Sequence, residues 1–123
     1  MLQNLEQLRA AHALLKTDRL DRQAINKIPA LIINNGLLAA AAFSLGESRS
    51  GMRAAFEATT DYLKQRGHLA SNTPATPDGL IDHLSRRAAT SADLQRATSE
   101  ALAYLAYLKR FAKKGRGGDD TEE

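Results

Sequence analysis

The chain has no cysteine and no tryptophan, and only 5% of its residues are aromatic. Without cysteine, disulfide bonds, thiolate nucleophiles and cysteine-ligated zinc are excluded, which suits a reducing cytoplasm. Alternating apolar and polar runs are short, whereas alanine and leucine dominate, so little in the sequence favours β-strands. For 123 residues we predict an all-α fold, a single compact bundle of five or six helices.

Signals for secretion, membrane insertion and catalysis are also missing. Residues 1–6 contain no basic or long apolar stretch typical of a secretory signal. The uncharged stretch 28–46 contains Pro29 and two central amides, which favours a buried helix over a membrane span. The three histidines lack metal-ligand spacing. We expect a cytoplasmic protein with no enzyme activity, cofactor, metal, small-molecule substrate or membrane contact.

Helix-start and helix-stop signals divide the chain. Pro29 either opens a new helix or kinks the one before it, and Gly36 is a natural stop or bend. Asp78 or Thr76 caps a short helix, and Thr90 or Ser91 caps the last one. The predicted helices cover residues 4–17, 18–35, 37–45, 52–66, 78–88 and 91–114. We predict a helical domain over residues 1–114 and a disordered tail, glycine-rich then acidic, over 115–123.

Two helix faces are predicted to be apolar. Leu5, Leu8, His12 and Leu15 share one stripe of the first helix, while Leu14 lies opposite and is available for a second contact. The helix at 37–45 is apolar almost all round and is therefore expected to be central.

The overall balance of 17 basic and 14 acidic residues hides an uneven distribution. Residues 115–123 hold four acids and only one base, Arg116, so the remainder carries 16 bases against 10 acids. That excess favours an anionic partner, of which nucleic acid is the commonest, although plain solubility explains such a charge equally well.

The last helix carries a basic stripe opposite its apolar face. At 100° per residue, Arg96, Tyr107, Arg110 and Lys114 point away from the core. Basic residues around an aromatic suit a phosphate track with a base-stacking platform. The alternative is a solvated face whose basic residues interact favourably with the partial negative charge at the C-terminal end of the helix.

Arg9 falls inside the apolar arc of the first helix. It is either paired internally or located at a protein or RNA contact, and we favour a structural role. Glu100 is the candidate partner, although Glu100 is equally placed to pair with Arg96 one turn earlier. In the segment Asn34–Gly36, the glycine permits a bend or a close helix approach, and the amides satisfy freed backbone groups.

Three segments together resemble a known family: LEQLRA at 5–10, PALIINNGLL at 29–38 with Phe43, and RATSEALAYL with LKRFA over 96–112. The chain resembles the small subunit of type III-B CRISPR effector complexes, the fifth protein of the Cmr set. Tyr107 stands where tryptophan is expected, and the acidic tail lies outside the resemblance. The matching motif positions are Arg9, Asn35, Gly36, Arg96, Glu100, Lys109 and Arg110.

The resemblance implies a non-catalytic helical subunit in antiviral defence. Its expected partners are the other subunits of the complex, copies of itself, and guide and target RNA. From helical geometry we predict these RNA-contacting residues: Arg96, Lys109, Arg110, Lys113 and Lys114, with Lys16, Arg19, Arg22 and Lys27 as a second patch. Arg9, Asn35, Gly36 and Glu100 are assigned to structure. The alternatives are a small subunit of a type III-A or type I complex, or a helical protein-interaction module without nucleic acid.

Overall fold

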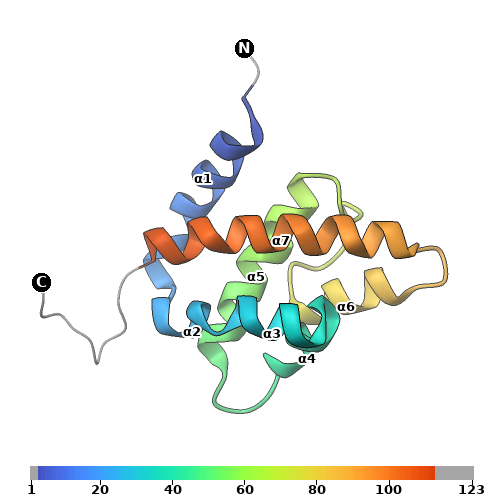
Figure 1. Cartoon of the computed structure of the whole chain (residues 1–123), viewed down its shortest axis with the longest axis horizontal. Helices are drawn as coiled ribbons and strands as arrows, with labels where there is room; N and C mark the ends of the chain where they lie inside the picture. The colour runs from blue at the N-terminus through green and yellow to red at the C-terminus, as the bar shows by residue number, and fades with distance from the viewer. Residues whose placement is uncertain (1–2, 113–123) are drawn as a thin grey trace, which may run out of the picture.

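The computed structural model describes residues 3–112, and these residues form helices and connecting turns without a β-strand (Figure 1). The α-helices are α1 (Leu5–Lys16), α2 (Arg22–Asn26), α3 (Ile28–Asn35), α4 (Leu37–Phe43), α5 (Ser50–Gln65), α6 (Pro77–Ser85) and α7 (Ser91–Phe111). A 3-10 turn, Thr17–Arg19, follows α1. The predicted helix over 18–35 is therefore corrected: its first residues belong to the 3-10 turn, Leu20 is extended, and the rest forms two helices, α2 and α3, with Lys27 between them. The predicted all-helical fold class is confirmed.

Local capping determines where the helices begin. Asn4 accepts the N–H of Gln7, and Gln7 reciprocates to the Asn4 N–H, so a capping box starts α1. Thr90 and Asp93 form the same arrangement at α7. Thr76, rather than Asp78, caps α6 by accepting the Gly79 N–H. Pro29 sits in the first turn of α3 and thus opens a new helix.

Helix α7, the longest helix in the described residues, contacts four other helices. It packs against α1, α2, α3 and α5, while α6 packs against α4 and α5 (Figure 1). Its inward residues Ala101, Tyr104, Leu105 and Leu108 are completely or almost completely buried. Burial of these side chains stabilises the bundle, because apolar area removed from water is the main favourable term in folding. The same packing places the end of α7 beside α2.

The predicted inward stripe of the first helix is wrong for two of its four members: Leu5 and Leu15 face solvent, whereas His12 is buried and Leu8 is half-buried. Leu5 and Leu15 are 44% and 80% exposed, and Leu14 is 59% exposed. The buried side chains of α1 are His12, which belonged to the predicted stripe, and Ala13, which did not. The inward face is set by the tyrosine and carboxylate groups that α5 and α7 present, which α1 meets through His12.

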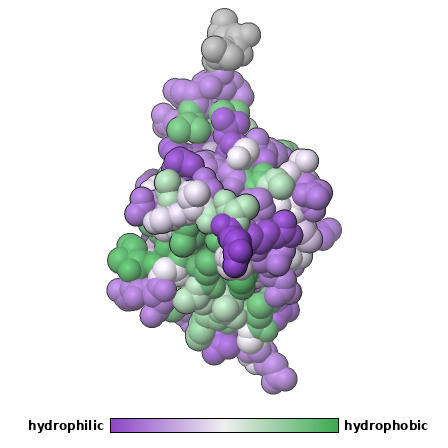
Figure 2. All heavy atoms as spheres, turned by 90° about the vertical axis from the view of Figure 1, so that its right-hand side faces the viewer, coloured by the Kyte–Doolittle hydropathy of each residue, from purple (hydrophilic) through white to green (hydrophobic). Residues whose placement is uncertain are grey.

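The apolar segment 31–45 is only partly central. Ile32, Leu37, Ala40 and Ala41 are buried, but Ile33 is 72% exposed. Phe43 and Leu45 are also exposed, at 41% and 37%. Figure 2, which views the side that carries α4, α6 and the start of α7, shows apolar residues gathered over the lower part of that face. The prediction of a fully buried helix over 37–45 is therefore corrected: one side of α4 faces solvent.

Candidate nucleic-acid interface

Arg22 holds the end of α7. Its Nε and Nη2 donate to the carbonyl oxygen of Ala112 at 3.1 and 2.8 Å, and Nη2 also lies 3.5 Å from the Arg110 carbonyl oxygen. The last carbonyls of a helix have no partner inside the helix, and its C-terminal end carries partial negative charge. The Arg22 guanidinium donates hydrogen bonds to these carbonyls and its positive charge offsets the partial negative charge. These interactions fix it beside the last turn of α7.

This arrangement gathers three predicted basic residues from two separate segments. Arg22, Lys109 and Arg110, together with Ala106, line a shallow hollow of about 340 Å³ that we call the basic hollow. None of the described residues that line it is acidic. Asp21, the neighbour of Arg22, is occupied in capping α2 through the Gln23 N–H. Three cations without a lining carboxylate favour an anion such as a backbone phosphate.

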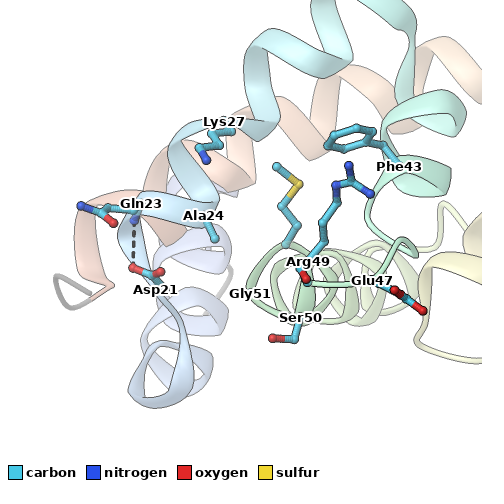
Figure 3. A pocket seen from close by; sticks show the side chains of 11 residues that line it. Asp21, Gln23, Ala24, Lys27, Phe43, Glu47, Arg49, Ser50 and Gly51 are labelled. Carbon is cyan, nitrogen blue, oxygen red and sulfur yellow. Dashed lines mark hydrogen bonds between the residues drawn. The ribbon is translucent and has the colours of Figure 1, made fainter. Parts of the chain in front are cut away.

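The other residues of the predicted second patch lie in different surroundings. Lys16 is 3.6 Å from Asp61, and it lines a hollow with Arg19 that also contains Glu57. Lys27 faces a larger hollow of about 650 Å³, which includes Asp21 and Glu47 (Figure 3). These three cations are each accompanied by carboxylates, so the structure does not bring the second patch together as one positive surface.

Arg96 is also separate from the basic hollow. It lies about 21 Å along α7 from Arg110, given the helical rise of about 1.5 Å per residue. Its Nη2 is 2.7 Å from Asp93 Oδ1, in an exposed ion pair. Hydrogen bonds from Thr90 hold the pKa of Asp93 below its ordinary value, so this partner stays charged. Lys113 and Lys114 lie outside the described residues.

Arg9 and Glu100 form the internal pair that the sequence suggested. Arg9 Nε and Nη2 each donate to a different carboxylate oxygen of Glu100, both at 2.8 Å. Tyr62 O–H donates to Glu100 Oε2 at 2.6 Å. The bonds from Arg9 hold the pKa of Glu100 below its ordinary value despite burial. Arg96 is not involved, so the alternative pairing with Glu100 is set aside.

A second polar chain, missed from sequence, lies beside the first. Tyr104 O–H contacts His12 Nδ1 at 2.6 Å, and His12 Nε2 lies 2.8 Å from Asp61 Oδ2. Burial lowers the pKa of His12, so the ring is neutral near pH 7 and its Nε2–H donates to Asp61. The Tyr62 and Tyr104 rings stack at 4.4 Å. The sequence signal that could have revealed this chain is the presence of polar residues, His12, Asp61 and Tyr104, at inward positions of three helices.

Gly36 is required by its backbone conformation. With φ 97° and ψ 158° it occupies a region open essentially to glycine alone. Its N–H closes α3 on the Ile32 carbonyl, and its carbonyl begins α4 by accepting the Ala40 N–H. A Cβ here would meet no atom within 4 Å, so the glycine serves the bend and not a close approach. Asn35 is exposed.

Two further cations were not singled out by the sequence. Arg49 lies over the Phe43 ring with its guanidinium carbon 3.8 Å from the ring centre (Figure 3). Arg53 donates to the Gly46 carbonyl oxygen at 3.2 Å. Arg49 belongs to the turn between α4 and α5, where no helical periodicity marks inward and outward positions, whereas Arg53 lies near the start of α5 and reaches back to that turn. Their interactions tie that turn together.

Neither a membrane-spanning helix nor a metal-binding group is found in the part of the chain that is described. None of its helices is long and apolar enough to cross a bilayer. Among residues 3–112, no three histidine or acidic side chains converge as ligands would. The geometry thus defines a class: a small helical domain with a tyrosine-rich polar interior and a cationic hollow at the end of its longest helix.

The comparison with protein families identifies the chain within this class. Residues 5–114 match the family described as CRISPR-associated protein (Cas_Cmr5). The chain belongs to the Cas_Cmr5 family, the Cmr5 subunit of the type III-B CRISPR effector, which is generally a non-catalytic small subunit. Neither the curated proteins nor the solved structures give a match to this chain.

Proposed function

We propose that this chain is a non-catalytic structural subunit that contacts the backbone of the guide and target RNA within the cytoplasmic type III-B complex. The observation that carries the proposal is the basic hollow, in which Arg22, Lys109 and Arg110 meet without a lining carboxylate. Guide and target recognise each other by base pairing, so a protein beside the duplex needs charge and shape and no base-edge readout.

The proposal also includes stacking of several copies along the RNA. Exposed apolar side chains support it, because they lie on two different elements. Leu14 and Leu15 project from α1, whereas Ile33 projects from α3. A head-to-tail contact needs two unlike surfaces on each copy. Family membership supports type III-B over the type III-A and type I alternatives.

Charge reversal at the basic hollow tests the RNA contact. The variant K109E/R110E, placed in the reconstituted complex, replaces two exposed cations per copy by acids. We expect target RNA to bind about ten-fold more weakly at 0.1 M salt, because phosphate contacts become repulsive. The matched control is R86E/R87E, which reverses two exposed cations after α6, at the opposite end of α7 (Figure 1).

The measurement is a filter-binding titration with labelled target RNA, after gel filtration shows that each variant complex is assembled. The control complex is expected to retain the unmodified dissociation constant within about two-fold. Equal binding by both variants and the unmodified complex contradicts the proposed contact. It favours the remaining alternative, a protein-interaction module without nucleic acid.

A further inference from the structure

The acidic residues of segment 119–123 have a cationic counterpart within reach. The last described residue is Ala112, and its carbonyl oxygen accepts hydrogen bonds from Arg22, which lines the basic hollow. Asp119 follows seven residues later. Seven fully extended residues span at most about 24 Å, whereas the one helical turn between Lys109 and Ala112 rises only about 5 Å. The segment is therefore long enough to reach Lys109.

The sequence between these points allows a reversal of direction. Three of the four residues at 115–118 are glycine, which adopts left-handed and right-handed backbone conformations with equal ease. Such a short tether keeps the local concentration of the acids near the hollow in the millimolar range. The four acids lie outside the matched range, which ends at residue 114.

We propose that segment 119–123, through Asp119, Asp120, Glu122 and Glu123, docks on the basic hollow of its own chain and competes with RNA phosphates for Arg22, Lys109 and Arg110. This inference rests on the proposed function for the competition with RNA, but the docking itself does not. Charge complementarity supports it, because the segment carries four carboxylates and the hollow is lined by three cations that no described lining residue neutralises.

The competition regulates RNA access without a second protein. A segment that occupies the hollow about 80% of the time raises the apparent dissociation constant for RNA about five-fold. In a complex with several copies, the growing duplex displaces the docked segments one after another. RNA that binds weakly displaces fewer segments and is therefore rejected first. High salt removes the effect, since exposed charges are screened over about 4–5 Å at 0.5 M.

Carbodiimide crosslinking of the full chain tests docking in the absence of RNA. At low micromolar protein, we expect mass spectrometry of the monomeric product to show amide links from the four acids to Lys109. The matched reference is Lys27, an exposed lysine whose hollow already contains carboxylates. Links at Lys109 that are no more frequent than those at Lys27, or links confined to Lys113 and Lys114, overturn docking.

The variant D119N/D120N/E122Q/E123Q tests competition in the reconstituted complex. We expect target RNA to bind about five-fold more tightly than in the unmodified complex at 0.1 M salt, with no difference at 0.5 M. Unchanged affinity together with a normal loss in K109E/R110E overturns the competition and leaves the proposed function standing. Unchanged affinity in both variants, with Lys109 still crosslinked, shows instead that the hollow does not contact RNA and thereby overturns both the competition and the RNA contact.

Discussion

Glu100 is the residue on which the polar interior converges. It accepts two hydrogen bonds from Arg9 and one from Tyr62, and it joins α1, α5 and α7 at one point. A carboxylate with an exposed fraction of only 7% is stable there because every one of these bonds is made. The three helices are therefore tied by a specific charge pair as well as by apolar packing.

Substitution of Glu100 by glutamine is expected to destabilise the fold. The variant E100Q keeps the side-chain shape but leaves the partly buried Arg9 charge without its counter-charge. We expect the free energy of unfolding to fall by about 2–4 kcal/mol, measured by urea denaturation with circular dichroism. The control R96Q breaks an exposed pair and is expected to change it by less than about 0.5 kcal/mol. Equal losses contradict the assigned role of Glu100.

His12 gives the fold a pH dependence above the range of its carboxylates. Burial lowers its pKa from 6.5, against the opposing effect of Asp61, while Lys16 lowers it further. Tyr62 and Tyr104 are the other titratable groups that face the ring. The unfolded chain binds a proton at pH values where the folded chain does not, so stability is full above about pH 7 and falls as the pH drops through 6.5.

The variant H12Q is expected to flatten this dependence. Between pH 7 and pH 5, the unmodified protein should lose stability with a slope of at most about 1.4 kcal/mol per pH unit, since one proton is involved. Urea denaturation at successive pH values measures the slope in both proteins. The variant H83Q, on α6 and outside the polar chain, should keep the slope of the unmodified protein. A slope that survives in H12Q would assign the titration to another group.

At the scale of the elements, the bend between α3 and α4 depends on one residue. The variant G36A places a methyl group at φ 97°, where there is room for it but no favourable backbone conformation. We expect a loss of about 1–3 kcal/mol in the free energy of unfolding. The control A39G alters the exposed side of α4 and is expected to cost about 1 kcal/mol or less. A tolerated alanine at position 36 would contradict the backbone argument.

Some helix starts were predictable because their causes are local, whereas the breaks within the predicted helix over 18–35 and the end of α6 at Ser85 were not. The caps at Asn4 and Thr90 bond to residues three positions later, and Pro29 acts on its own turn. The inward face of α1 was not predictable from its own period. Leu15 is exposed and His12 is buried because Tyr104 and Asp61, distant in sequence, complete the hydrogen bonds of the imidazole.

The candidate surface shows the same limit. From the sequence, Lys109 and Arg110 were predicted to lie on one helix, as they do in α7, but Arg22 was assigned to a different patch. Only the packing of α2 against α7 brings Arg22 to the end of that helix. Likewise, the pairing of Arg96 with Asp93 depends on side-chain rotamers that periodicity does not specify.

At the scale of the whole molecule, the proposed contact predicts a steep response to salt. Each phosphate neutralised contributes about 0.7–0.9 to the slope of log affinity against log salt. For RNA binding by the reconstituted complex, K109E/R110E is expected to reduce that slope, whereas R86E/R87E is expected to preserve it. Titrations at several salt concentrations measure both slopes. Identical slopes in all three complexes would place the phosphate contacts elsewhere.

The exposed leucines of α1 carry a consequence for the life of the molecule in a cell. A newly made copy that has not met its neighbours displays Leu14 and Leu15 to every chaperone and protease it encounters. Under the stacking proposal, the copy that covers them also protects them from degradation. Under the same proposal, we expect copies outside a complex to be degraded faster than copies within one.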